Sequence, residues 1–140
     1  MGLLVSYIVA IEPGYACTCM APATAMEALQ KSSAVFRGRV VTIYRSFLDR
    51  VGITNTAGYR VQFEITKQWK GALSKSTVVI TRLTGEACGF PFEENKEYLV
   101  YVVTEPKDIQ TGICTGTKNI AEAEREMKEL DKLLERSSDN

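Results

Sequence analysis

The sequence predicts a mainly β domain with one helix near each end of the chain. Five segments rich in β-branched and aromatic residues follow one another, and polar or glycine-bearing stretches separate them. Helix-forming residues at helical spacing precede the first segment and follow the last. A chain of 140 residues is long enough to form one domain with a sizeable core. We therefore expect five antiparallel strands that close into a small barrel.

The first helix and the first strand are predicted near the N-terminal end. Residues 23–31 are good helix formers, with Met26, Leu29 and Ala25 on one face. Residues 34–44 read AVFRGRVVTIY, a composition typical of a long strand, and Gly38 predicts a bend or bulge within it. The polar, glycine-bearing residues 45–58 are expected to form a loop or a loose hairpin.

The other four predicted strands cover residues 59–69, 77–83, 97–104 and 111–114. In the first of these, an apolar row formed by Tyr59, Val61, Phe63 and Ile65 alternates with polar residues, which predicts a half-buried strand. Trp69 and this row are most simply barrel core. Lys70-Gly71 is expected to end the strand.

A C-terminal helix is predicted from Ile120 to about Arg136. Asn119 is a good N-cap, and Glu122 is spaced to reach back to the cap amide. Apolar residues then recur at steps of three and four, and the charged residues between them form the solvent-exposed face of the helix. Five strands with a helix at each end fit the oligonucleotide/oligosaccharide-binding (OB) topology best.

Residues 1–16 are predicted to be a signal peptide. Leu3 to Ile11 is a nine-residue apolar run, too short for a membrane-spanning helix, and Gly14 and Ala16 are the small residues a signal peptidase requires. No basic residue precedes the run, so a hydrophobic first strand or a buried N-terminal segment is the competing interpretation. Cleavage after Ala16 would produce an exported chain that begins at Cys17. Residues 17–136 are then the single domain, and residues 137–140 are a polar tail.

The four cysteines lie at positions 17, 19, 88 and 114, which allows three pairings. Cys17 and Cys19 are too close to bridge comfortably, so we expect each to pair with a distant partner. Two such bridges would hold the N-terminal segment against the rest of the domain, and each is worth about 2–5 kcal/mol. A four-thiolate zinc site is a weaker alternative, because its second pair of ligands would be split by 25 residues.

Charge and composition exclude several function classes. The predicted mature chain carries 17 basic and 16 acidic residues, and this net charge near +1 gives no long-range attraction to nucleic acid or to an anionic membrane. The chain contains no histidine, the commonest general base and a frequent ligand of catalytic metals. No motif pairs a nucleophile with a base, so we predict that the protein is not an enzyme.

The chain resembles the inhibitory domain of the tissue inhibitors of metalloproteinases. The resemblance begins with Cys17-Thr18-Cys19-Met20-Ala21-Pro22 and covers the chain to about Glu122. Its most specific parts are the Cys-X-Cys start, Ala87-Cys88-Gly89 and Ile113-Cys114. The stretch KEYLV at residues 96–100 and the strand end Trp69-Lys70-Gly71 add to it.

This resemblance implies a netrin-like OB barrel with Cys17–Cys88 and Cys19–Cys114 disulfides. The chain departs from the family pattern in three ways. The family has a third disulfide that begins in the first helix, but no cysteine lies between positions 19 and 88 here. The family's second, disulfide-bonded domain is replaced by the predicted helix from Ile120. Ala21 occupies a position where the family commonly has proline. The chain therefore looks like a compact relative of the family.

The mechanism implied by the resemblance is capping of a foreign zinc ion. The α-amine and carbonyl oxygen of Cys17 would displace water from the open coordination position of a zinc endopeptidase. The amine must be neutral to donate its lone pair, and an ordinary α-amine has a pKa of about 7.7–8.0. Thr18 would enter the specificity pocket, while the other residues of the ridge would lie along the cleft: Cys19, Met20 and Ala21, and beside them Glu86, Ala87 and Cys88.

The resemblance thus implies a secreted monomeric inhibitor with a protease partner and no cofactor of its own. Without the resemblance, Thr18 is simply a small residue between two disulfides, and Glu86 is a solvated acid in a loop. Met20 then fits the role of an N-terminal packing residue as well as that of a residue that contacts the protease cleft. Two other functions stay open. One is a non-inhibitory extracellular OB module that binds protein or saccharide. The other is a thiol-redox or metal-carrying protein that uses Cys17 and Cys19, which a free-thiol count would reveal.

Overall fold

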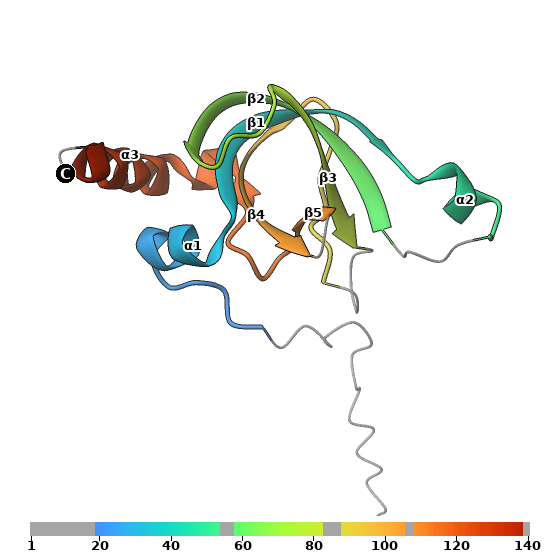
Figure 1. Ribbon diagram of the computed structural model, residues 1–140, viewed down its shortest axis with the longest axis horizontal. Coiled ribbons are helices and arrows are strands. Elements are labelled where there is room, and N and C mark those ends of the chain that lie inside the picture. Colours follow the sequence, from blue (N-terminus) through green and yellow to red (C-terminus); the bar gives the residue numbers. More distant parts are fainter. Residues whose placement is uncertain (1–18, 54–57, 83–87, 106–107, 139–140) are drawn as a thin grey trace, which may run out of the picture.

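A computed structural model describes residues 19–53, 58–82, 88–105 and 108–138 of this chain. Its element order confirms the mainly β prediction, with one helix before the first strand and one after the last (Figure 1). In these described ranges, no helix has the length and apolar character needed to cross a membrane. The predicted signal peptide, residues 1–16, lies outside the described residues.

Five strands close into a barrel of OB type. The strands are β1 (Ala34–Tyr44), β2 (Gly58–Lys70), β3 (Ser76–Arg82), β4 (Glu97–Glu105) and β5 (Asp108–Thr111). They are hydrogen-bonded in the order β1-β2-β3-β5-β4, and the β1–β4 pairing closes the ring. A sixth strand, β6 (Lys118–Asn119), adds two residues to the outer side of β4.

The prediction that all strands are antiparallel is wrong at one pair, because β3 and β5 are parallel. The reason is geometric. Strand direction cannot alternate throughout a closed ring with an odd number of members, so one neighbouring pair in a five-stranded barrel must run the same way. The two strands meet through Ile80 opposite Gln110 and Thr81 opposite Thr111.

Strand β1 has the predicted bounds, and its long pairing with β2 bends at Gly38. The register shifts between Arg37 and Gly38, which confirms the predicted irregularity. A Cβ atom at position 38 would lie 3.0 Å from the Phe36 ring and 3.2 Å from the Glu64 carbonyl oxygen. Glycine therefore allows β2 to approach β1 closely where the sheet curves.

The barrel interior is filled by the alternating side chains that the sequence marks as apolar. Phe36, Val61 and Phe63 are fully buried there, and Ile65 nearly so. Aromatic rings pack edge to face across the interior, with centroid distances of 5.3 Å for Phe36–Phe63 and 5.2 Å for Phe63–Phe92. Two residues are exceptions to the predicted barrel core. Trp69 belongs to a second apolar cluster outside the ring, and Tyr59 is only half-buried and lies outside the core cluster.

Two helices cover this second cluster. Helix α1 (Ala25–Lys31) begins at Thr24, whose Oγ1 accepts the Glu27 amide, and it buries Ala25 and Ala28. Of the residues predicted to share one face, Ala25 is buried and Met26 is 47% exposed, because the two alanines are the residues that pack inward. Helix α3 (Glu124–Ser138) packs beside α1 and β2, with Leu130 buried.

Polar contacts fix α3 on the barrel. The Trp69 indole donates to Asp131 at 2.7 Å, and the Tyr101 hydroxyl donates to Glu126 at 2.7 Å. Lys67 and the Trp69 indole hold the pKa of Asp131 below its usual range. Burial, together with the Glu126 carboxylate, raises the pKa of Tyr101 above its usual range. The tyrosine therefore remains a hydroxyl donor in this contact.

Three local predictions are corrected by the structure. The loop expected at residues 45–58 contains a helical turn, α2 (Phe47–Arg50), because Ser46 caps it. The fifth strand is Asp108–Thr111, three residues earlier than predicted, and residues 113–116 form turns. Asn119 makes no side-chain cap and begins only a short 3-10 turn, η2 (Ile120–Glu122), so the long helix starts at Glu124.

Candidate functional site

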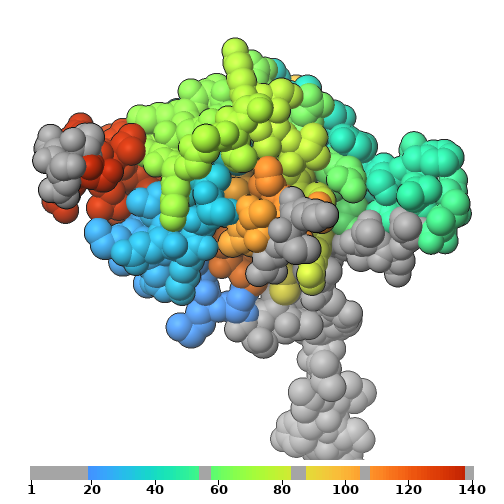
Figure 2. All heavy atoms as spheres, in the orientation of Figure 1, coloured from blue at the N-terminus to red at the C-terminus, as the bar shows by residue number. Residues whose placement is uncertain are grey.

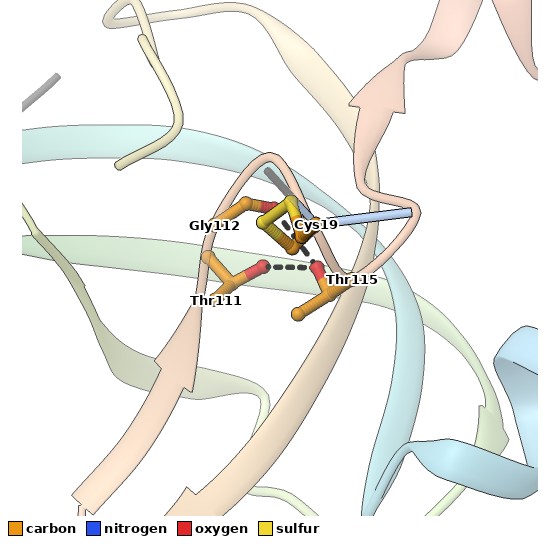
Figure 3. The surroundings of a disulfide bond; sticks show 5 residues. Cys19, Thr111, Gly112 and Thr115 are labelled. Carbon is orange, nitrogen blue, oxygen red and sulfur yellow. Dashed lines mark hydrogen bonds between the residues drawn. A yellow bond between two sulfur atoms is a disulfide. The ribbon is translucent and has the colours of Figure 1, made fainter. Parts of the chain in front are cut away.

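The candidate site is the edge of the barrel where the N-terminal segment is tied to the loop after β5. A disulfide joins Cys19 to Cys114 across 95 positions of sequence, with 5.6 Å between their Cα atoms (Figure 3). This confirms the pairing that the family resemblance implies for these two residues. It also corrects the alternative of a four-thiolate zinc site, since two of its four ligands are joined as a disulfide.

Three threonine hydroxyls hold the loop that carries Cys114. The Thr111 hydroxyl lies 3.1 Å from that of Thr115, which also donates to the Gly112 carbonyl at 3.0 Å (Figure 3). The Thr117 hydroxyl lies 2.7 Å from that of Thr111. Thr111 and Thr117 are buried. The cluster is connected to β4, because the Tyr101 amide donates to Thr117 and Thr111 donates to the Tyr101 carbonyl. The loop thus has a fixed conformation at the point where the disulfide leaves it.

The Cys88 segment packs directly against the same loop. The Cys88 carbonyl oxygen accepts the Ile113 amide at 3.1 Å. A Cβ atom at Gly112 would lie only 2.6 Å from that oxygen, so the approach requires glycine. Cys88 itself has a positive φ of 62° and is disulfide-bonded. Its predicted partner, Cys17, lies outside the described residues.

The chain after Cys88 is anchored in the barrel interior. The Phe90 amide donates to the Thr81 hydroxyl at 2.8 Å, and the Glu93 amide donates to the Tyr98 hydroxyl at 2.8 Å. The rings of Phe90 and Phe92 lie 5.6 Å and 4.8 Å from the Tyr98 ring, both edge to face. Cys88 therefore follows the barrel closely, and its position is set by core packing.

The structure brings together those members of the predicted ridge that it describes. Cys19, Met20 and Ala21 are exposed, and the Cys19–Cys114 bond places them beside the loop that contacts Cys88. Met20 is 90% exposed, so the alternative in which it packs as an N-terminal core residue is wrong. Cys17, Thr18, Glu86 and Ala87 lie outside the described residues, and their predicted roles stay predictions.

Sequence reasoning missed two parts of this edge, the threonine cluster and the close approach at Gly112. The stretch GICTGT contains the signal, since four of its six residues are threonine or glycine around a cysteine, but only the fold shows which hydroxyls meet. In the described part of the chain no group of three or more cysteine, aspartate or glutamate side chains could hold a metal ion. What this edge can present is exposed backbone and small side chains held by disulfide and hydrogen bonds.

Neither the scan against protein-family models nor the search of curated proteins returns a match to this chain.

Proposed function

We propose that the protein inhibits zinc endopeptidases by capping the catalytic zinc with the α-amine and carbonyl oxygen of Cys17. The observation that carries the proposal is the fixed edge formed by Cys19, Cys114 and Cys88. It presents an exposed segment, Cys19 to Ala21, only two residues after the proposed zinc ligand. A rigid segment loses little conformational entropy on entering a cleft, so the arrangement favours tight binding.

The proposal assigns a part to each residue of the ridge. A catalytic zinc has three protein ligands and one position for water, which the Cys17 nitrogen and oxygen would occupy together. Thr18 would enter the pocket beyond the metal, and Met20 and Ala21 would follow the cleft as substrate does. Glu86, Ala87 and Cys88 would contact the cleft from the neighbouring segment. The barrel contributes rigidity and takes no part in the zinc chemistry.

Blocking the α-amine tests the proposal. Three forms are compared: a chain that begins at Cys17, the same chain with one alanine added before Cys17, and a control with one alanine added after Asn140. Each form is assayed against two classes of zinc endopeptidase, one whose zinc is held by three histidines and one whose zinc is held by two histidines and a glutamate. We expect the first and third forms to inhibit at least one enzyme, and the alanine before Cys17 to weaken that inhibition by orders of magnitude.

Equal inhibition by all three forms would rule out the capping mechanism. No inhibition by any form, with the fold intact by circular dichroism, would instead favour a non-inhibitory binding module of the same fold. Replacing Thr18 by glycine separates selectivity from folding. We expect the Thr18→Gly variant to change the ranking among the enzymes and to leave the free energy of unfolding nearly unchanged.

A further inference from the structure

Helix α2 and the three residues that follow it present apolar side chains to solvent. Phe47 is 64% exposed, Leu48 46%, Val51 50% and Ile53 72%, and we call these four residues the α2 tip. The polar residue of the turn, Asp49, is 8% exposed. This is the reverse of an ordinary surface helix, which turns its apolar side inward. A cluster of exposed apolar side chains indicates an interaction site.

The turn that carries the α2 tip is capped at both ends. The Ser46 hydroxyl accepts the Asp49 amide at 3.3 Å. At the other end Gly52, with φ of 77°, donates to the Asp49 carbonyl at 3.2 Å, and Ile53 donates to the Leu48 carbonyl at 3.0 Å. These two bonds form a Schellman motif, which brings the residue after the glycine back toward the last helical turn. The apolar side chains are therefore held outward by a defined backbone.

The α2 tip stands away from the barrel. Figure 1 shows α2 beyond the end of β1, on the side opposite α3, and Figure 2 shows it as a knob at the margin of the molecule. A projecting surface of apolar side chains has a shape that can insert into the interface of a lipid layer.

Four arginines surround the base of the α2 tip, and we call them the basic rim. Arg45 and Arg50 flank the turn in sequence, while Arg60 and Arg82 line a hollow of about 250 Å³ together with Asp49 and Asp108. Arg60 pairs with Ile80 in the sheet, so Arg60 and Arg82 are diagonal neighbours on one face.

The guanidinium groups of the basic rim outnumber the carboxylates beside them, with four arginines against Asp49 and Asp108. Within the described ranges, none of the four has a hydrogen bond or an ion pair with a carboxylate, whereas Arg37 and Arg39 on the same sheet are paired with Glu97 and Glu64. The Nε atom of Arg45 is enclosed without a hydrogen-bond partner. Apolar side chains surrounded by an excess of cations are complementary to lipid tails beneath anionic headgroups.

We propose that the α2 tip inserts into the interface of an anionic phospholipid membrane, with the basic rim binding the headgroup phosphates. The net charge of the whole chain predicts no attraction to such a membrane. The proposal departs from that prediction because the charges are segregated, with ion pairs elsewhere on the barrel and an excess of arginines around α2. The surface is separate from the edge that carries Cys19 and Cys114.

Vesicle flotation tests the proposal with the full oxidised chain. The vesicles contain phosphatidylcholine with about 30% phosphatidylglycerol, or phosphatidylcholine alone. We expect the protein to float with the anionic vesicles and to bind the neutral ones at least about tenfold more weakly. The double variant Phe47→Ser/Ile53→Ser should lower the partition coefficient by about tenfold or more. A control, Met26→Ser/Leu134→Ser, removes apolar side chains on α1 and α3 that are 47% and 42% exposed, and it should bind like the unmodified chain.

A second variant separates the contribution of charge. Arg60→Gln/Arg82→Gln should bind anionic vesicles more weakly and lose most of the preference over neutral vesicles. Inorganic phosphate at millimolar concentration should not release the unmodified chain from anionic vesicles, because a free anion competes only at the basic rim and leaves the apolar contacts of the α2 tip in place. The proposal is overturned if the unmodified chain does not float with anionic vesicles, as expected for a protein-binding tip. Equal flotation of the Phe47→Ser/Ile53→Ser variant would also overturn it.

Discussion

Replacing Gly112 by alanine tests how closely the Cys88 segment packs on the disulfide loop. The new Cβ atom would lie 2.6 Å from the Cys88 carbonyl oxygen, and the two must separate by about 0.4 Å to reach even the 3.0 Å limit for such contacts. The atom that has to move is backbone, and it also accepts the Ile113 amide at 3.1 Å. The substitution therefore strains or breaks the contact between two segments of the proposed ridge.

The expected loss of stability follows from three contributions. Overpacking at a close contact costs about 1–3 kcal/mol, and losing a backbone hydrogen bond costs about 1 kcal/mol more. Alanine also restricts the unfolded chain, which returns about 0.4–1 kcal/mol. We expect the Gly112→Ala variant to unfold with a free energy about 1–3 kcal/mol lower than that of the unmodified protein.

Urea denaturation of the oxidised protein measures this change, and hydrogen exchange reports the Ile113 amide directly. Ile113→Ala is the matched control, because it alters the same loop at a 42% exposed side chain without approaching Cys88. The control should lose less than about 1 kcal/mol and keep its amide protected. If Gly112→Ala equals the unmodified protein in both measurements, the close packing of Cys88 on the loop is not real.

Three further predictions concern the loop, the helix and the zinc ligand. Thr117→Val should lower the free energy of unfolding by about 1–3 kcal/mol in urea, since the buried Tyr101 amide loses its acceptor; an unchanged midpoint would contradict this. Because the folded pKa of Asp131 is lowered, its contribution to stability is present above the unfolded pKa of about 3.9 and is lost as pH falls through the folded value. In the Asp131→Asn variant the free energy of unfolding should therefore fall less steeply as the pH is lowered below about 3.9. The same pH dependence as in the unmodified protein would refute this role of Asp131. The inhibition constant should rise about tenfold for each pH unit below about 7.7, because the α-amine must be neutral to bind zinc. An inhibition constant that does not change with pH in that range would contradict this prediction.

Patterns that depend on neighbouring residues predicted the fold well. The run AVFRGRVVTIY predicted β1 with its observed bounds, because β-branched and aromatic residues at this density fit the pleated, half-buried surface of a sheet. The alternation around Phe63 predicted the buried face of β2 for the same reason. The C-terminal periodicity predicted α3, although it predicts a start at Ile120 and the helix begins at Glu124.

Features that depend on distant contacts were not predictable from local sequence. The parallel β3–β5 pair follows from closing an odd number of strands, and it becomes visible only once the ring is known. Helix α2 is too short to show a period, and its apolar side chains face outward. The threonine cluster joins residues that meet only because the disulfide and β4 hold the loop. The Cys19–Cys114 pairing came from the resemblance, since four cysteines allow three pairings and the close spacing of Cys17 and Cys19 excludes only one of them.

The central claim is that a nitrogen atom of this chain becomes a ligand of another protein's zinc. The most direct measurement replaces the zinc of an inhibited endopeptidase by cobalt(II) and records its visible absorption during titration with the chain that begins at Cys17. We predict that the cobalt bands change and saturate at one equivalent, and that the chain with alanine before Cys17 leaves them unchanged. Full inhibition with an unaltered cobalt spectrum would contradict the claim.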